Sequence, residues 1–111
     1  MDQLVELAKR LGCQMASHER TTLLKAAQKE VNGDDEAEKL IQAYQAQAQR
    51  MTELEKTNQP IEVADKQKLG ELEEKIGTHP ALAELTRRQV DFVEMMRKVK
   101  QAIDEQLQIE V

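Results

Sequence analysis

The sequence predicts an all-α protein: an antiparallel helical bundle or coiled coil of long helices, completed by dimerisation. Ala, Glu, Lys, Leu and Arg supply 55 of the 111 residues, a proportion typical of long helices and coiled coils. Apolar residues recur at spacings of three and four, which is the period of a helix with one buried face. Residues that break helices lie mostly between these periodic stretches. Together these observations favour several helices joined by short connections.

The first expected element is an amphipathic helix that ends near residue 16. Its apolar residues follow one another at spacings of four, three and four, so they share one face: Leu4, Ala8, Leu11 and Met15. The next apolar stripe, which begins at Leu23, is out of phase with this face. We therefore expect a kink or break at residues 16–18. Ser17 is the expected N-cap of a second helix, because its hydroxyl can accept a hydrogen bond from an unpaired first-turn N–H.

The second helix is expected to end at Asn32-Gly33, since Gly33 suits the left-handed conformation that follows many helices. Asp34 or Asp35 then caps a third helix over residues 35–57. That helix ends before Pro60, because proline disfavours the helical conformation in the residue before it. Its apolar residues at helical spacing are Ala37, Leu40, Ile41, Tyr44, Ala48, Met51 and Leu54.

A fourth, shorter helix is expected over residues 62–76, with Gly77 as its end and a buried face of Leu69, Leu72 and Ile76. Pro80 opens the last helix, which runs to about residue 108. Proline is tolerated at a first helical position because its missing N–H would be unpaired there anyway. A helix of about 28 residues is roughly 42 Å long at 1.5 Å per residue.

The last helix carries a heptad pattern, called here the predicted seam. Its residues alternate at spacings of three and four, as the a and d positions of a coiled coil do. They are Leu82, Leu85, Gln89, Phe92, Met96, Val99, Ile103 and Gln106. A stripe of this length has to be buried against other long helices. We therefore expect a homodimer, and the pattern leaves a higher oligomer open.

Gln89 in the predicted seam and the adjacent pair Met95 and Met96 each allow more than one interpretation. Gln89 is either a polar residue that specifies the register of pairing or a residue that points out of a drifting seam. Met96 fits the seam and is expected in the core. Its neighbour Met95 is then a candidate contact with a protein partner, and Tyr44 is a second candidate contact.

Composition and charge argue against several classes of function. The net charge of −5 disfavours direct binding of nucleic acid, which needs surplus Lys and Arg. Basic residues between 87 and 100 are diluted by Asp91 and Glu94, so we expect a solvated face there. No apolar run reaches 18 residues, so no membrane insertion is expected. Charged residues within the first ten positions and the single Cys13 favour a cytoplasmic location.

No catalytic or metal-binding constellation can be assembled from the sequence. His18-Glu19 starts like a zinc-protease motif, but Thr22 stands where the second histidine is required. His79 is expected at a helix start, either capping it or exposed to solvent. One thiol, Cys13, could bind a metal only by sharing a site across a dimer. We therefore expect no enzyme activity, no cofactor and no bound metal.

The order of several short motifs resembles the YlbF/YmcA family of small helical bacterial proteins. The motifs cover almost the whole chain: Leu11-Gly12, Leu24 with Ala27, Asp35-x-Ala37-x-x-Leu40-Ile41-x-x-Tyr44-Gln45, Pro60 before Lys68-Leu69 and Leu72, and His79-Pro80-x-Leu82 leading to Gln89-x-x-Phe92 and the Val99 to Ile103 tail. The chain departs from the family in having His79-Pro80 where members usually have Asn-Pro. It also has Tyr44-Gln45 where members often have Phe-Gln.

The resemblance implies an all-α dimer with a regulatory, non-enzymatic role. Studied relatives promote competence, sporulation and biofilm development, in a multi-protein complex that modulates a membrane-anchored ribonuclease and so affects RNA processing. Some relatives hold iron–sulfur clusters through cysteines, and the single Cys13 of this chain matches no such set. The sequence thus predicts one domain over residues 1–111 that acts as a cytoplasmic regulatory adaptor through protein–protein contacts. The alternative is a self-assembling helical scaffold with no RNA-related role.

Overall fold

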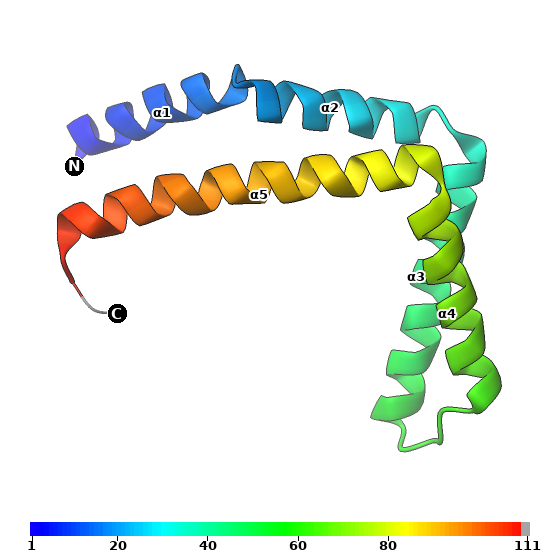
Figure 1. Ribbon diagram of the computed structural model, residues 1–111. Helices are drawn as coiled ribbons and strands as arrows, with labels where there is room; N and C mark the ends of the chain where they lie inside the picture. Colours follow the sequence, from blue (N-terminus) through cyan, green and yellow to red (C-terminus); the bar gives the residue numbers. More distant parts are fainter. Residues whose placement is uncertain (110–111) are drawn as a thin grey trace. The chain divides into compact units, whose positions relative to one another are not determined.

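The computed structural model describes residues 1–109 and contains, within them, five α-helices and no strand (Figure 1). The helices are α1 (Asp2–Ala16), α2 (Glu19–Asn32), α3 (Asp35–Lys56), α4 (Val63–Thr78) and α5 (Pro80–Leu107). The predicted all-α fold class is confirmed. The last two residues of the predicted domain, 110 and 111, lie outside the described residues.

The helices form two compact units. Unit 1 joins Met1–Gln28 to the chain from Leu85 onward, and unit 2 is Lys29–Glu84. Helices α2 and α5 therefore contribute residues to both units.

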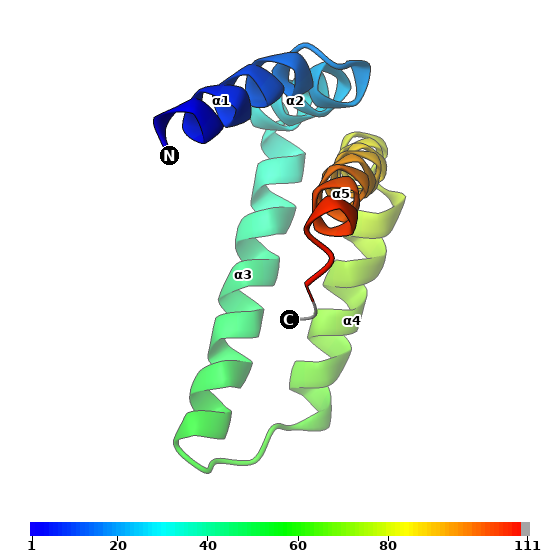
Figure 2. The same ribbon diagram turned by 90° about the vertical axis from the view of Figure 1, so that its left-hand side faces the viewer.

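Unit 2 is built on an antiparallel hairpin of α3 and α4, which lie side by side (Figure 2). Each helix turns toward the other a stripe with alternating spacings of three and four. On α3 the stripe is Leu40, Tyr44, Gln47, Met51 and Leu54, and on α4 it is Asp65, Leu69, Leu72 and Ile76. All of these residues are buried or half-buried. Two of them are polar, and this has consequences for the register of the hairpin.

The N-terminus of α3 is capped as predicted. Asp34 has an extended backbone, and its Oδ1 accepts a hydrogen bond from the Ala37 N–H at 3.0 Å. This bond satisfies one of the four N–H groups that a helix start leaves unpaired. Of the two candidates, Asp34 is therefore the cap.

The left-handed helix end expected at Gly33 lies instead at the other end of α3. Asn58 has a φ of 57°, and no described glycine has a positive φ. The Gln59 N–H donates to the Leu54 carbonyl at 2.8 Å, and the Asn58 N–H donates to the Glu55 carbonyl at 3.2 Å. This is a Schellman motif with asparagine in the position that glycine usually takes. Asparagine tolerates that conformation better than most residues with a side chain.

The connection between α4 and α5 is set by proline rather than by glycine. The expectation that Gly77 ends α4 was wrong, because α4 continues to Thr78. His79 then has an extended backbone, with ψ at 122°, as expected for a residue before proline. Pro80 is the first residue of α5, as predicted.

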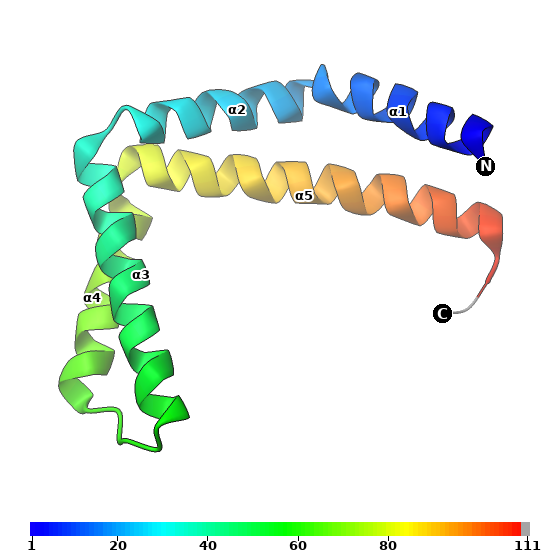
Figure 3. The ribbon, with the colours of Figure 1, turned by 180° about the vertical axis from the view of Figure 1, so that it is seen from behind.

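Unit 1 places α1 and the first part of α2 along α5 (Figures 1 and 3). The predicted apolar face of α1 is present, but it is only partly covered. Leu11 and Met15 are half-buried, whereas Leu4 and Ala8 are exposed, as is Leu7 beside that face. No residue of α1 is fully buried. The face therefore remains available for a further contact.

The break between α1 and α2 falls at Ser17 and His18, within the predicted range. Ser17 was expected to be the N-cap of α2, but it is instead the C-cap of α1. Its backbone continues the helical turn, so its hydroxyl reaches back and donates to the Gln14 carbonyl at 3.1 Å. His18 takes the cap position, and its Nδ1 accepts a hydrogen bond from the Arg20 N–H at 3.1 Å.

The side of α5 that is covered within this chain follows the predicted seam only in part. Leu82 is buried and Leu85, Phe92 and Val99 are half-buried, whereas the other four seam positions are exposed: Gln89, Met96, Ile103 and Gln106. Between Phe92 and Val99, however, Met95 is 8% exposed and Met96 is 45% exposed. Within this chain Met95 is therefore the covered methionine and Met96 the exposed one, whereas the sequence placed Met96 in the core. Met95 lies on the side of α5 that faces α1 and the start of α2, so the neighbouring helices of unit 1 decide which methionine is covered.

The cap at His18 can be tested directly. His18→Ala leaves the Arg20 N–H unpaired, so the free energy of unfolding should fall by about 1 kcal/mol. His18→Asn keeps a short side-chain acceptor at the same place and should retain most of that stability. Urea denaturation followed by circular dichroism measures both variants. Equal losses in the two variants would show that the side-chain acceptor of His18 contributes nothing.

Candidate protein-binding surfaces

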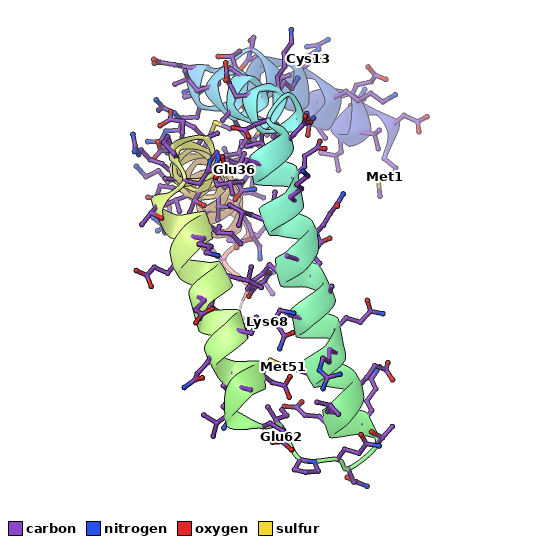
Figure 4. The ribbon with its side chains drawn as sticks, turned by 90° about the vertical axis from the view of Figure 1, so that its right-hand side faces the viewer. Met1, Cys13, Glu36, Met51, Glu62 and Lys68 are labelled. Carbon is purple, nitrogen blue, oxygen red and sulfur yellow. The ribbon has the colours of Figure 1, made fainter. Side chains whose placement is uncertain are left out.

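The described residues offer several candidate binding surfaces. No group of three or more His, Cys, Asp or Glu side chains among residues 1–109 could hold a metal ion. Cys13 is exposed on α1 (Figure 4). No helix in the described part of the chain is both long enough and apolar enough to cross a membrane. The features that remain are two polar contacts in unit 2 and two surfaces of unit 1.

The first polar contact is a polar lock between α3 and α4, formed by Gln47, Arg50 and Asp65. The side chain of Gln47 is almost fully buried, and its Nε2 donates to the Asp65 carbonyl at 3.0 Å. The Arg50 Nε donates to Asp65 Oδ1, also at 3.0 Å. The lock lies within one turn of Met51 on α3 and Lys68 on α4 (Figure 4).

The same carboxylate also holds the start of α4. Asp65 Oδ2 accepts a hydrogen bond from the Glu62 N–H at 3.4 Å, which completes a capping box. The hydrogen bond from Arg50 is the largest cause that holds the pKa of Asp65 below its usual value. Partial burial opposes this by raising the pKa, while the bonds from Gln47 and Glu62 and the charge of Arg50 lower it further. The ionised form of Asp65 is therefore the one that this site stabilises.

The polar lock was missed from the sequence, although a signal for it is present. Gln47 stands three residues after Tyr44 and four before Met51, so it occupies a position on the apolar stripe of α3. Asp65 stands four residues before Leu69, at the matching kind of position on α4. Polar residues at such positions specify which turns of two helices face each other. A slip of one turn would leave both polar groups buried against apolar neighbours.

The second polar contact joins the α2–α3 connection to the α4–α5 connection. His79 Nε2 lies 3.4 Å from Asp34 Oδ2, and the His79 side chain is only 10% exposed. Its Nδ1 is buried and has no hydrogen-bond partner in the structure of residues 1–109. The alternative of surface exposure was therefore wrong, whereas His79 does take a cap position, as the C-cap of α4 directly before α5. The imidazole of His79 and the carboxylate of Asp34 thus lie within ion-pair distance.

The first surface of unit 1 is the α5 stripe, defined as Val93, Met96, Ile103 and Leu107. These apolar side chains are all exposed, and Ile103 is 49% exposed. Their spacings of three, seven and four place them on one side of α5. Two of them, Met96 and Ile103, belong to the predicted seam.

The second surface is the α1–α5 groove, a hollow of about 440 Å³ between the end of α1, the start of α2 and the middle of α5. It is lined by Leu11, Gln14, Met15, His18, Arg20, Met95, Lys98 and Val99. Four of these side chains are apolar and two are cationic. The combination is an apolar floor with a basic rim.

The rim of the groove carries more positive than negative charge. Arg20 Nη1 donates to the Asp91 carbonyl at 3.0 Å, which ties the start of α2 to α5. Lys98 Nζ lies 3.8 Å from Glu94, and Arg97 Nη2 lies 2.9 Å from the same carboxylate. The Arg97 hydrogen bond is the main reason that the pKa of Glu94 is lowered; desolvation opposes it, and the charges of Arg97, Lys98 and Arg20 reinforce it. The carboxylate of Glu94 thus interacts with three cations, those of Arg97, Lys98 and Arg20.

The structure divides the residues of the predicted seam among different environments. Leu82 is buried within unit 2, while Leu85 and Phe92 are half-buried in unit 1. Val99 lines the α1–α5 groove, and Gln89 is exposed. The two candidate contacts separate as well. Met95 lines the groove, whereas Tyr44 is half-buried on the α3 stripe.

The comparison with protein families matches nearly the whole chain. The family model described as "Control of competence regulator ComK, YlbF/YmcA" covers residues 4–108, a range that includes the groove, the α5 stripe and the polar lock. The chain belongs to the YlbF/YmcA family. The description of the YlbF/YmcA family names control of a regulator, not catalysis, which supports a regulatory role. No curated protein matches the chain.

The polar lock predicts an effect on acid stability. Because the folded-state pKa of Asp65 is lowered, its ionised form stabilises the fold above the unfolded-state pKa of about 3.9. That contribution is lost as the pH falls through the lower folded-state value. Asp65→Asn should therefore reduce the free energy of unfolding near neutral pH and flatten its decline on acidification. Urea denaturation over a series of pH values measures both effects.

A matched control for this test is Glu73→Gln, which removes a carboxylate from an exposed position on the same helix. It should leave the pH profile close to that of the unsubstituted protein. If Asp65→Asn retained the original acid dependence, the carboxylate of Asp65 would not be the group that couples stability to pH.

Proposed function

We propose that the protein is a non-enzymatic cytoplasmic regulatory adaptor, a homodimer that binds a protein partner through its helical surface. The observation that carries this proposal is the exposed apolar surface of unit 1. The α5 stripe and the outer part of the α1 face, Leu4 and Leu7, are both uncovered. Apolar patches of this kind mark surfaces where proteins associate. The family's link to control of a regulator supports the same role.

An estimate of the energy of pairing indicates how much surface a dimer needs. Fully burying a large apolar side chain contributes about 1.5–3 kcal/mol. The four side chains of the α5 stripe are roughly half exposed, so covering them in two copies contributes roughly 6–12 kcal/mol. Association itself costs an estimated 4–15 kcal/mol in lost freedom of motion. The stripe alone therefore supports weak pairing, and a stable dimer also uses the exposed Leu4 and Leu7 of α1.

The partner of the adaptor is proposed to be a protein rather than a nucleic acid. The net charge of −5 opposes the close approach of phosphates. A role in RNA processing, as the family resemblance implies, would then be exerted through a protein that acts on RNA. In the alternative, a self-assembling scaffold, the exposed faces would bind only further copies of the chain.

The pairing proposal is tested by charges placed in the α5 stripe. The double variant Met96→Glu, Ile103→Glu would bury two carboxylates per chain in the interface, so dimerisation should weaken by at least about tenfold. Sedimentation equilibrium over a range of concentrations measures the change. Gln101→Glu, an added carboxylate on another side of α5, is the control and should leave dimerisation nearly unchanged.

The outcomes separate the proposals. A chain that is monomeric at every concentration would contradict the dimer, and assemblies that keep growing with concentration would favour the scaffold. Capture of the tagged protein from its native cytoplasm, with and without ribonuclease, tests the adaptor. A stoichiometric protein partner that survives the treatment is expected. Loss of the partner on treatment would indicate that RNA mediates the association.

A further inference from the structure

The α1–α5 groove faces a different direction from the α5 stripe. Lys98, on the rim of the groove, follows Met96 of the stripe by two residues. At about 100° per residue, Lys98 and Met95 point about 160° and 100° away from Met96 around the helix, and Val99 about 60° away. A pairing of two chains through the stripe therefore leaves the Lys98 side of α5 uncovered.

We propose that the α1–α5 groove is the docking site for a helix of a partner protein, one whose apolar face is flanked by carboxylates. This inference rests on the proposed adaptor function and specifies the chemistry of the partner. The arguments concern the shape of the floor, the charge of the rim and the loose packing of α1.

The floor of the groove has the spacing of apolar side chains against which a helix can pack. α1 supplies Leu11 and Met15, and α5 supplies Val99 and Met95, of which Met95 is 8% exposed. Within each pair the residues are four apart, so each wall presents two apolar side chains one helical turn apart. A third helix inserts its own side chains between such pairs. The two methionines suit this role because their flexible, polarisable side chains adapt to an incoming surface.

The apolar face of α1 is incompletely covered within this chain. A helix with apolar residues along one face gains stability by burying that face. α1 has such a face, yet none of its residues is fully buried. The half-buried Leu11 and Met15 reach α5 only across the open groove. A docked helix would cover both walls at once.

The rim selects the charge of the partner. Among the residues that line the groove, Arg20 and Lys98 are cationic and none is a carboxylate. The side chain of Lys98 is 60% exposed, and its ion pair with Glu94 is long because Arg97 holds that carboxylate more closely. Arg20 uses one of its five N–H donors on the Asp91 carbonyl. Both cations can therefore receive a carboxylate from outside.

A nucleic acid fits the groove less well than an acidic helix does. Its phosphates would satisfy the two cations, but the apolar floor would gain no apolar partner. The rest of the chain, with its net negative charge, would also repel it. A helix with an apolar face flanked by acidic side chains can make apolar contacts with the floor and ion pairs with the two cations of the rim.

The test uses methyl NMR of the full chain, labelled at methionine. Four of the five methionines report on separate places: Met15 and Met95 on the groove, Met96 on the α5 stripe and Met51 on unit 2. The probe is a synthetic amphipathic helical peptide with leucines on one face and flanking glutamates. A second peptide carries lysines in place of the glutamates. The glutamate peptide should shift the Met15 and Met95 methyl signals and leave Met51 unchanged.

Affinities measured by fluorescence anisotropy test the role of the rim. Lys98→Glu should weaken the glutamate peptide by at least about tenfold and reverse the preference between the two peptides. Lys25→Glu makes the same change of charge at an exposed position of α2 outside the groove, and it should alter the affinity less than about twofold.

Several results would overturn the proposal. Equal binding of both peptides, or no shift at Met15 and Met95, would remove the acidic helix as the ligand. Concentration-dependent shifts of these two signals without peptide would assign the groove to a second copy of the chain. Shifts on addition of a single-stranded RNA oligonucleotide, but not of the peptide, would assign it to nucleic acid.

The failure of this proposal is distinguishable from the failure of the proposed function. The variant with glutamates at positions 96 and 103 should bind the peptide normally, since those positions lie outside the groove. If a protein partner is captured from the cytoplasm while the peptide does not bind, the adaptor function stands and the groove proposal falls. If the peptide binds a chain that remains monomeric, the groove proposal stands and the dimer falls.

Discussion

The structure depends on a shortage of buried apolar surface. Among the described residues only six apolar side chains are buried, and no large side chain is completely enclosed. A third of the residues are charged and only 2% are aromatic, so the helices have few large apolar side chains with which to form a deep core. Each helix gains what it can from one apolar stripe. Two consequences follow: polar contacts take a large part in defining the structure, and apolar surface is left uncovered.

Polar contacts specify what the apolar stripes leave undetermined. Stripes of Leu, Ile, Met and Ala accept several registers at similar energy, because their side chains are alike in size and shape. The Gln47–Asp65 contact accepts only one, since any other register would leave buried hydrogen-bonding groups unpaired. The contact of His79 with Asp34 and the cap at His18 likewise define where helices stop and start. Stability and specificity thus come from different residues.

The uncovered apolar surface is what connects the fold to a regulatory role. Unit 1 exposes an apolar stripe on one side of α5 and an apolar groove with cations on another. The two surfaces differ in chemistry: the stripe is apolar along its length, and the groove combines an apolar floor with a basic rim. Self-association and recognition of a partner can therefore use separate faces of the same helix.

The sequence by itself determined the helices. The ends of the helices were predicted to within a few residues from the apolar periodicity and from local signals: the Asp34 cap, Pro80 and the helix-breaking residues 58–60. These signals act within one or two turns of the chain. Which face each helix buries was decided by tertiary packing, as the exchange of Met95 for Met96 shows. The groove also lay beyond local patterns, since Arg20 and Lys98 are far apart in the sequence. Local sequence sets backbone preference, whereas a surface exists only once distant helices have met.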